Sequence, residues 1–204
     1  MAKLNAPLFS FGASGTIAKA LVYFPWKGLN VVRSWVSPAN PQTAAQITQR
    51  GRLTACVALI HTVQAAATDP LVEKDQTAYA LLGSLQPTPR TWFNTIVKQW
   101  LDQKVAVKIP VIYHGVTLTA ASTQVTFQSG HTTESSALTS GKVYYGTSKS
   151  NLNSSVDFTA LELLAGKAIT GLTNNVKYYF QFRALVPAGM IDSDSGIYYA
   201  TPVA

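Results

Sequence analysis

The sequence predicts an α+β protein with two domains: a β-hairpin followed by about three helices in residues 1–104, and a β-sandwich in residues 105–204. Apolar residues recur at helical spacing between about residues 41 and 101. From about Gln103 onward, helix formers give way to short runs rich in Val, Thr, Ser and Tyr between turn residues, which is typical of strands. A chain of 204 residues is long enough for two small domains.

The hairpin is expected near the N-terminus. Two apolar, β-prone runs, residues 16–24 and 29–36, flank the sequence Pro25-Trp26-Lys27-Gly28, and side-chain alternation makes both faces largely apolar. An isolated two-stranded hairpin is at best marginally stable in water, so both faces need cover. We expect the helices that follow to cover one face, and a second subunit to cover the other.

Three helices are expected after the hairpin. Asn40 can cap the first helix and Pro41 suits its first turn, so this helix is predicted over about residues 41–67. A second helix is predicted over about residues 69–83, and a Pro-rich break precedes the third. The third helix is the most clearly amphipathic, because its apolar residues form one wide stripe: Trp92, Phe93, Ile96, Val97, Trp100 and Leu101.

Aromatic and basic residues of the first domain are the candidates for contact with another chain. Trp is the residue type most enriched at interface hot spots, although packing within the domain is the alternative for Trp26 and Trp35. The apolar N-terminal arm either packs on its own domain or lies against a neighbouring subunit. The interface candidates are Phe9, Phe11, Trp26, Lys27, Arg33, Trp35 and Arg50.

The order of residues in this region resembles a loosely defined family of small phage- and prophage-associated structural proteins without assigned activity. The resemblance covers about half of the first domain. It rests on Ser14, Gly15, Tyr23, Trp26, Lys27, Gly28, Arg33, Pro38, Asn40, Pro41, Gln42, Thr43, Gln46 and Arg50.

Seven strands are expected in the second domain, which is the count of an immunoglobulin-like β-sandwich. They are predicted at residues 116–119, 124–128, 142–147, 156–159, 168–169, 177–185 and 197–201. Residues 169–202 resemble a fibronectin type III domain, with Leu172 six residues before Tyr178, where that family has its tyrosine corner. Phe127 departs from the family, which commonly has Trp there. The resemblance implies a spacer, adhesion or decoration module and not an enzyme.

Composition narrows the class of protein. The net charge is +7, and residues 1–104 carry ten Lys/Arg against four Asp/Glu, so an electrostatic partner is expected to meet the first half. The basic residues are dispersed, so we do not expect direct binding of nucleic acid.

The single cysteine, Cys56, is expected to be a small buried hydrophobe. We find no pattern of a signal peptide and no apolar run that would span a membrane.

Catalytic and metal-binding groups do not cluster in the sequence. His131 with Glu134 lacks an activated nucleophile, and Asp192 with Asp194 lacks the further ligands of a calcium loop. The protein is therefore expected to be no enzyme and to need no metal and no cofactor.

These observations favour a virion structural protein, assembled in the host cytoplasm, that is a decoration or tail-associated component. Its partners would be itself and other virion proteins in a symmetric assembly. One alternative is a subunit of a bacterial extracellular or cell-surface filament. Another is a host-recognition module whose second domain binds glycans through surface tyrosines, the candidates being Tyr144, Tyr145, Tyr198 and Tyr199.

Overall fold

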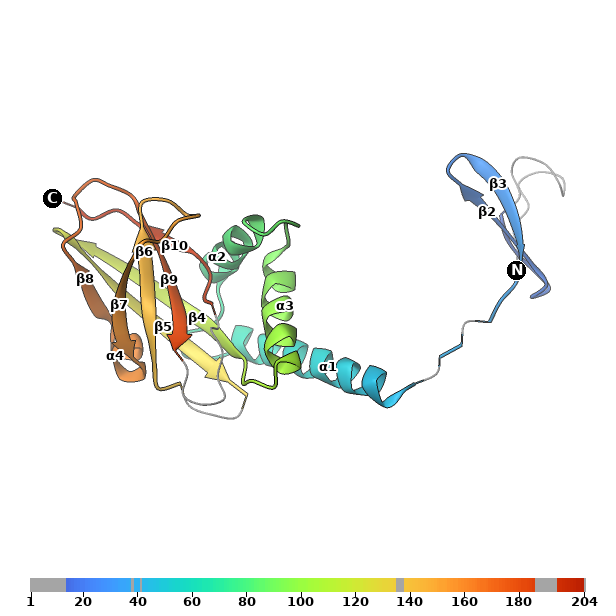
Figure 1. Cartoon of the computed structure of the whole chain (residues 1–204), viewed down its shortest axis with the longest axis horizontal. Coiled ribbons are helices and arrows are strands. Elements are labelled where there is room, and N and C mark those ends of the chain that lie inside the picture. The colour runs from blue at the N-terminus through green and yellow to red at the C-terminus, as the bar shows by residue number, and fades with distance from the viewer. Residues whose placement is uncertain (1–13, 38, 41, 135–137, 186–193, 204) are drawn as a thin grey trace. The chain divides into compact units, whose positions relative to one another are not determined.

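The computed structural model describes residues 14–37, 39–40, 42–134, 138–185 and 194–203. Within these residues the chain forms four helices and three antiparallel sheets, which confirms the expected α+β class (Figure 1). The chain divides into two compact units, Met1–Thr43 and Ala44–Ala204. Phe9 and Phe11, two of the interface candidates, lie outside the described residues, as does Asp192.

The first unit contains a three-stranded sheet where a two-stranded hairpin was expected. Its strands are β1 (Gly15–Ile17), β2 (Leu21–Trp26) and β3 (Leu29–Ser34), in the order β1-β2-β3. The extra strand arises because the run 16–24 is broken by a three-residue loop, residues 18–20, in which Ala18 and Lys19 both have positive φ, 47° and 55°. Turns with two successive residues of positive φ match the twist of the strands they join. They usually contain Asn or Gly, so this sequence gives no sign of the turn.

The second unit begins with the three expected helices, α1 (Ala44–Gln64), α2 (Glu73–Ser84) and α3 (Trp92–Val105). Thr91 caps α3, because its hydroxyl accepts a hydrogen bond from the backbone N–H of Asn94. The helices share a core that includes Cys56, Ile60, Val63, Tyr79, Ile96 and Trp100.

The first half of α1 lies outside this core. Ile47 and Leu53, which the helical spacing places with the buried residues, are 55% and 43% exposed. Residues 44–51 are all exposed to solvent. Cys56, by contrast, is fully buried as expected, and burial raises the pKa of its thiol to about 12. The thiol is therefore protonated near neutral pH and behaves as an apolar side chain.

Two sheets follow, and each of the seven expected strands coincides with an observed one. One sheet has the order β4-β5-β8, with β4 at Val111–Ala121, β5 at Gln124–Thr133 and β8 at Lys167–Thr170. The other has the order β10-β9-β6-β7, with β10 at Tyr198–Ala200, β9 at Tyr178–Leu185, β6 at Ser140–Gly146 and β7 at Ser154–Thr159. A short helix, α4 (Ala160–Ala165), was not expected.

Residues of both sheets form one apolar core. The aromatic rings of Tyr113 and Phe182 meet edge to face at a centroid distance of 5.1 Å, and Phe127 meets Phe158 and Tyr198 at 6.3 Å. Phe127, Phe158 and Phe182 are almost completely inaccessible to solvent. Such edge-to-face pairs add to the stabilisation that burial of the rings supplies.

A buried carboxylate, that of Asp75, joins α2 to both sheets. One oxygen accepts hydrogen bonds from the backbone N–H groups of Val72 (3.2 Å) and Gly115 (2.9 Å). The other accepts from the backbone N–H of Val116 (3.2 Å) and from the hydroxyl of Tyr198 (2.9 Å). Gly115 and Val116 lie at an irregularity of β4, between His114 and Thr117, where pairing with β5 is interrupted. Asp75 therefore satisfies the two amides that the irregularity leaves without a strand partner.

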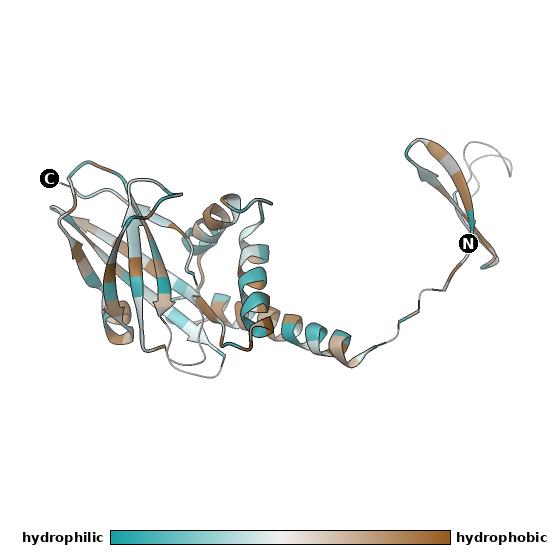
Figure 2. Cartoon of the chain, viewed as in Figure 1, coloured by the Kyte–Doolittle hydropathy of each residue, from teal (hydrophilic) through white to brown (hydrophobic). Residues whose placement is uncertain are grey.

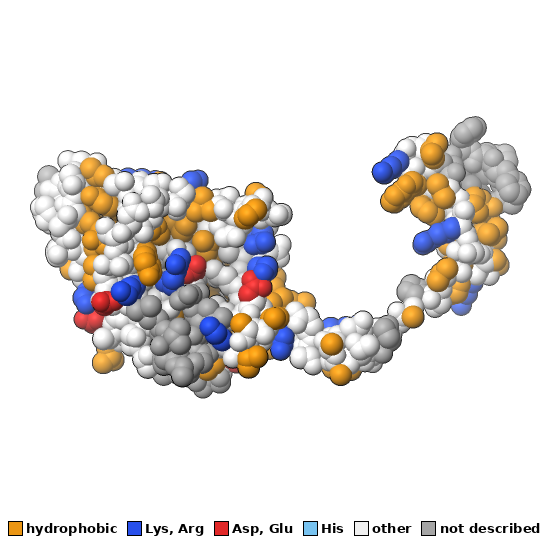
Figure 3. Space-filling model, in the orientation of Figure 1, with side chains coloured by type: hydrophobic (Ala, Val, Ile, Leu, Met, Phe, Trp, Pro, Cys, Tyr) orange, Lys and Arg blue, Asp and Glu red, His pale blue; other side chains and the backbone are white. Residues whose placement is uncertain are grey.

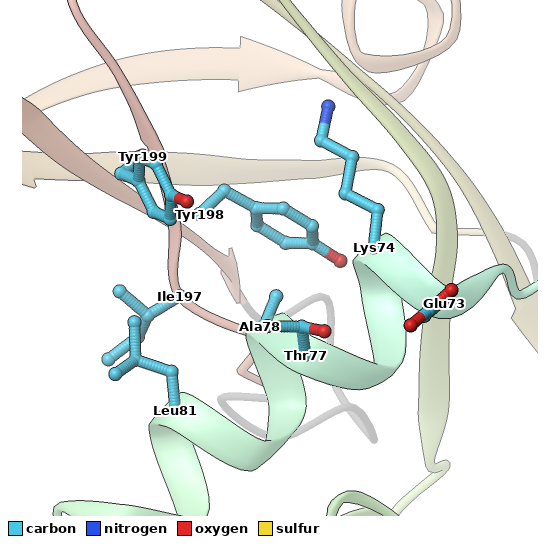
Figure 4. Close-up of a pocket in the computed structure, with 8 residues that line it drawn as sticks. All are labelled: Glu73, Lys74, Thr77, Ala78, Leu81, Ile197, Tyr198 and Tyr199. Atoms are coloured by element: carbon cyan, nitrogen blue, oxygen red, sulfur yellow. The ribbon is translucent and has the colours of Figure 1, made fainter.

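Further contacts attach α2 to the two sheets. The hydroxyl of Tyr79 donates to the carbonyl of Tyr113 and accepts from its N–H, both at 3.1 Å, so it closes part of the free edge of β4. The N–H of Ile197 donates to the carbonyl of Ala78 at 3.0 Å. Gly196 packs so closely on α2 that a Cβ there would lie 2.7 Å from Ala78. Figure 4 shows the ring of Tyr198 directed at the first turns of this helix.

The compact units divide the chain at Thr43 and Ala44, which does not coincide with the domain boundary expected between residues 104 and 105. The physical reason is the set of contacts made by Asp75, Ala78 and Tyr79, because these residues place α2 in the same hydrogen-bonded unit as β4 and β10.

Replacement of Asp75 by Asn tests this network. The side-chain NH₂ group would face donors that now meet a carboxylate oxygen, so we expect the free energy of unfolding to fall by roughly 2–4 kcal/mol. Urea denaturation followed by circular dichroism measures the change. Glu73→Gln is the matched control, because Glu73 is exposed in the same helical turn and its loss should cost less than about 1 kcal/mol. Equal stability of the two variants would show that the network is dispensable.

Candidate interaction surface

One face of the first unit's sheet forms a candidate interaction surface, called here the hairpin face. Paired residues of antiparallel strands point to the same side, and alternate residues along a strand share that side. The register pairs Val22 with Arg33, Phe24 with Val31 and Trp26 with Leu29. The hairpin face therefore consists of Val22, Phe24, Trp26, Leu29, Val31 and Arg33.

The hairpin face is apolar and open to solvent. Trp26 is 58% exposed and Leu29 is 68% exposed. A shallow hollow of about 370 Å³ is lined by Phe24, Trp26, Val31 and Arg33. In the described part of this unit, Tyr23 on the opposite face is the one buried hydrophobic residue. Figure 2 shows strongly hydrophobic residues along these strands. Monomeric proteins rarely expose an apolar surface of this kind, and such a surface usually marks a site of contact with a partner.

Two cations lie against the aromatic rings of this unit. The Lys27 ammonium is 5.9 Å from the centre of the Trp26 ring, and the Arg33 guanidinium is 5.4 Å from that of Phe24. Basic and apolar side chains are accordingly intermixed on the space-filling view of this unit (Figure 3). Such a surface can bury apolar area and pair with opposite charges in the same contact.

The other interface candidates occupy different places. Trp35 follows β3, is 38% exposed, and its N–H donates to the carbonyl of Ala20 at 2.7 Å. Arg50 lies in the exposed half of α1, in the second unit. The structure therefore places Trp26 and Arg33 on the same face, with Lys27 beside Trp26 in the turn and Arg33 at the opposite end, and it places Arg50 elsewhere. Phe24 and Leu29 belong to the hairpin face but were not singled out from the sequence, although strand alternation already pairs Phe24 with Trp26.

The residues predicted as a tyrosine corner lie at the start of β9. The hydroxyl of Tyr178 accepts a hydrogen bond from the backbone N–H of Thr173 at 3.2 Å, and hydrogen bonding with Thr173 lowers the pKa of Tyr178. Leu172 is buried in the core between the sheets. Its N–H donates to the carbonyl of Thr123 at 2.9 Å, which fixes the connection between β8 and β9.

A polar pocket of about 440 Å³ lies in the second unit between the end of α2, the β6–β7 loop and the outer side of β6 and β9. Arg183 pairs there with Asp194, Nε to Oδ1 at 2.6 Å, and its guanidinium lies 4.9 Å from the centre of the Tyr144 ring. The remaining lining includes amide, hydroxyl and ammonium groups of Gln86, Lys149, Ser150 and Gln181. We call this the Tyr144 pocket.

The four tyrosines considered for glycan binding are divided by strand alternation. Tyr198 is buried and bonded to Asp75, and Tyr145 stacks on Phe180 against the core. Tyr144 faces the Tyr144 pocket, while Tyr199 is 56% exposed beside Lys177. A second hollow, of about 410 Å³, lies between α2 and β10 and is lined partly by Lys74, Leu81 and Tyr199 (Figure 4).

Glu134 and Asp194, two of the groups weighed for chemistry, have ionic partners, whereas the buried Nδ1 atom of His131 meets no hydrogen-bond partner among the described residues. Glu134 pairs with Lys104, and Asp194 pairs with Arg183. His114 lies between the carbonyl of Asp69 and the hydroxyl of Thr132, and burial lowers the pKa of His131. Among the described residues, no three His, Cys, Asp or Glu side chains gather as metal ligands. None of the helices in that part of the chain combines the length and apolarity that crossing a bilayer requires.

No family model matches the chain, and neither a curated protein nor a solved structure matches it. What the chain does is therefore inferred from its own residues.

Replacement of Tyr178 by Phe tests the bond that fixes the start of β9. It leaves the N–H of Thr173 without this acceptor, so we expect a loss of about 1 kcal/mol in the free energy of unfolding. The midpoint of thermal unfolding should fall by roughly 2–4 °C in a chain of this size. Tyr199→Phe is the control, because this exposed hydroxyl is removed without loss of a described hydrogen bond and the midpoint should not move. Identical midpoints for both variants would contradict a structural role for the Tyr178 hydroxyl.

Proposed function

We propose that this chain is a non-enzymatic structural protein of a virion, a decoration or tail-associated component, which docks through its N-terminal unit and displays its C-terminal sheets. Its partners are other virion proteins and further copies of itself in a symmetric assembly, built in the host cytoplasm. The observation that carries the proposal is the hairpin face, an exposed apolar and basic surface on a unit whose described residues bury one hydrophobic side chain, Tyr23.

The size of the first unit supports docking. Its described strands contain three, six and six residues, so β1 adds little to a two-stranded hairpin, which by itself is at best marginally stable in water. Full burial of a large apolar side chain contributes about 1.5–3 kcal/mol of stabilisation, and Trp26 and Leu29 lack most of this contribution while they are exposed to water. Contact with a larger assembly would recover that energy and stabilise the sheet at the same time.

The second unit supports display, and we propose that its sheets form a fibronectin type III-like sandwich. Seven antiparallel strands are divided three and four, and the chain passes from β5 to β6 and from β7 to β8 between the sheets, as in Greek-key sandwiches. The bond between Tyr178 and Thr173 has the form of the tyrosine corner of such domains. Domains of this architecture serve widely as rigid spacers and binding modules, so this step rests on analogy of fold.

A second candidate function is recognition of a host glycan, and the Tyr144 pocket favours it. Sugars bind through stacking on aromatic rings and through hydrogen bonds to planar polar groups, and the pocket combines Tyr144 with Gln181, Arg183 and Asp194. The ion pair at 2.6 Å holds the guanidinium in place before a ligand arrives, which lowers the entropic cost of binding.

Replacement of Trp26 by Ala tests docking. The variant loses the largest side chain of the hairpin face, so incorporation into virions produced in host cells should fall at least tenfold, which corresponds to about 1.4 kcal/mol or more of contact energy. Quantitative mass spectrometry of purified particles measures the incorporation. Leu161→Ala is the matched control, because Leu161 is 79% exposed but lies in the second unit. Unchanged incorporation of the Trp26 variant would remove the docking surface, and filaments formed by the purified protein alone would favour a filament subunit.

Replacement of Tyr144 by Ala tests the glycan function. Saturation-transfer NMR on the full-length protein with a panel of neutral and acidic monosaccharides and disaccharides should detect binding that the variant weakens about tenfold or more. Tyr199→Ala serves as control, because Tyr199 is exposed outside the Tyr144 pocket. A panel without any binding sugar, or a larger loss in the Tyr199 variant, would argue against this pocket.

A further inference from the structure

The charges before Asp69 are all of one sign. Residues 1–68 contain six Lys or Arg and no Asp or Glu, the six being Lys3, Lys19, Lys27, Arg33, Arg50 and Arg52. The first unit therefore has no carboxylate side chain with which its own cations can pair. The same holds for the exposed first half of α1, residues 44–51. Because the first unit contains no acidic residue, any negative charges that pair with its cations have to come from the surface it contacts.

The cations of the first unit lie where the apolar area is exposed. Lys27 and Arg33 are placed over the rings of Trp26 and Phe24, at the turn end and the opposite end of the hairpin face. Leu29 and Val31 lie between them on β3. A partner that buries these aliphatic side chains must also desolvate two positive charges. This costs free energy unless the partner presents negative charges at matching positions.

A second copy of this chain supplies few of those negative charges. In the described residues, five carboxylates already pair with Lys or Arg of the second unit, namely Asp102, Glu134, Asp157, Glu162 and Asp194. Asp75 is buried with four donors around it. The exposed Asp69 and Glu73 remain, and Lys74 next to Glu73 offsets part of their negative charge. Contact between two first units would bring positive charges together. Charge complementarity therefore favours a different molecule with more carboxylates on its surface.

The chemistry of the hairpin face favours a protein over a nucleic acid. Single-stranded nucleic acids bind by stacking bases on aromatic rings, but on this surface each of the two rings has a cation of its own chain over it. The rest of the face is aliphatic: Val22, Leu29 and Val31. Aliphatic side chains with Trp and Arg are typical of the centre of protein interfaces.

We propose that the hairpin face binds a protein other than this chain, on a surface where carboxylates flank an apolar patch. The carboxylates pair with Lys27 and Arg33, while Trp26, Leu29 and Val31 are buried between them. This inference rests on the proposed docking function and adds the chemistry of the partner.

Carbodiimide cross-linking in purified virions tests the partner directly. The reagent adds to a carboxylate to form an O-acylisourea, and a lysine amine within contact distance attacks its acyl carbon, so that an amide bond forms and the reagent leaves as a urea. We expect mass spectrometry to find the Lys27 amine joined to an Asp or Glu of a different polypeptide. Lys27→Arg should be incorporated normally but lose this cross-link, because a guanidinium keeps the positive charge and does not form the amide.

Charge reversal gives a second measurement. Lys27→Glu should reduce incorporation at least about tenfold, because like charges then face each other at a contact. Lys177→Glu is the matched control, since Lys177 is an exposed lysine of the second unit that also lies over an aromatic ring, 3.7 Å from the centre of Tyr199, and incorporation of this variant should not change.

The outcomes separate this inference from the proposed function. Absence of the wild-type chain from virions would refute docking, and the inference with it. A chain that is present in virions but has Lys27 joined to another copy of itself, or cross-linked by ultraviolet light to nucleic acid, would overturn the acidic protein partner alone. Normal incorporation of Lys27→Glu would overturn it as well.

Discussion

The second unit depends on a single buried carboxylate. Asp75 is completely inaccessible to solvent and accepts four hydrogen bonds, from its own helix, from the irregularity in β4 and from Tyr198 in β10. These donors lie as far as 123 residues away in the sequence. A buried charge is tolerated because the surrounding donors replace the water it loses. The helices and the sheets are consequently held in one arrangement, with Tyr79 and Ala78 adding backbone contacts on either side.

The first unit has no comparable interaction among its described residues. Its strands pair by backbone hydrogen bonds, and Tyr23 is the one hydrophobic side chain there that is buried. The two units therefore differ in what stabilises them. The second is stabilised by a polar network and a large apolar core, whereas the first leaves apolar area exposed that a partner can cover.

The sequence was sufficient for features that depend on local pattern. The stripe of α3 and the seven strands were predictable because alternation and helical spacing record which side chains face a core. The turn at Ala18 and Lys19 was not, since neither residue marks positive φ. Helix α4 carried a readable signal, Thr159 followed by Glu162, which form a capping box in the structure.

Features that depend on distant contacts could not be read in advance. Nothing near Asp75 in the sequence indicates that Gly115 and Tyr198 surround it, so the attachment of α2 to both sheets was missed. Helical spacing likewise marked Ile47 and Leu53 as core residues, although α1 extends beyond the core that receives Cys56 and Ile60. For the candidate surface, residue type singled out Trp26 and Arg33, but only the register shows that they share a face and that Leu29 and Val31 complete it.

The two units differ in charge as well as in what stabilises them. In the second unit, ion pairs such as Lys104 with Glu134 and Lys142 with Asp157 balance charge locally, and exposed pairs of this kind contribute little to the free energy of folding. The second unit carries twelve Lys/Arg against nine Asp/Glu, a net charge of +3 over residues 44–204, whereas the much shorter first unit carries four Lys/Arg and no acid. In the first unit, Lys27 and Arg33 meet no acidic side chain of their own unit, and their positive potential adjoins exposed apolar area. Electrostatic attraction acts at long range and apolar burial acts at contact, so this one surface can both draw a partner in and hold it.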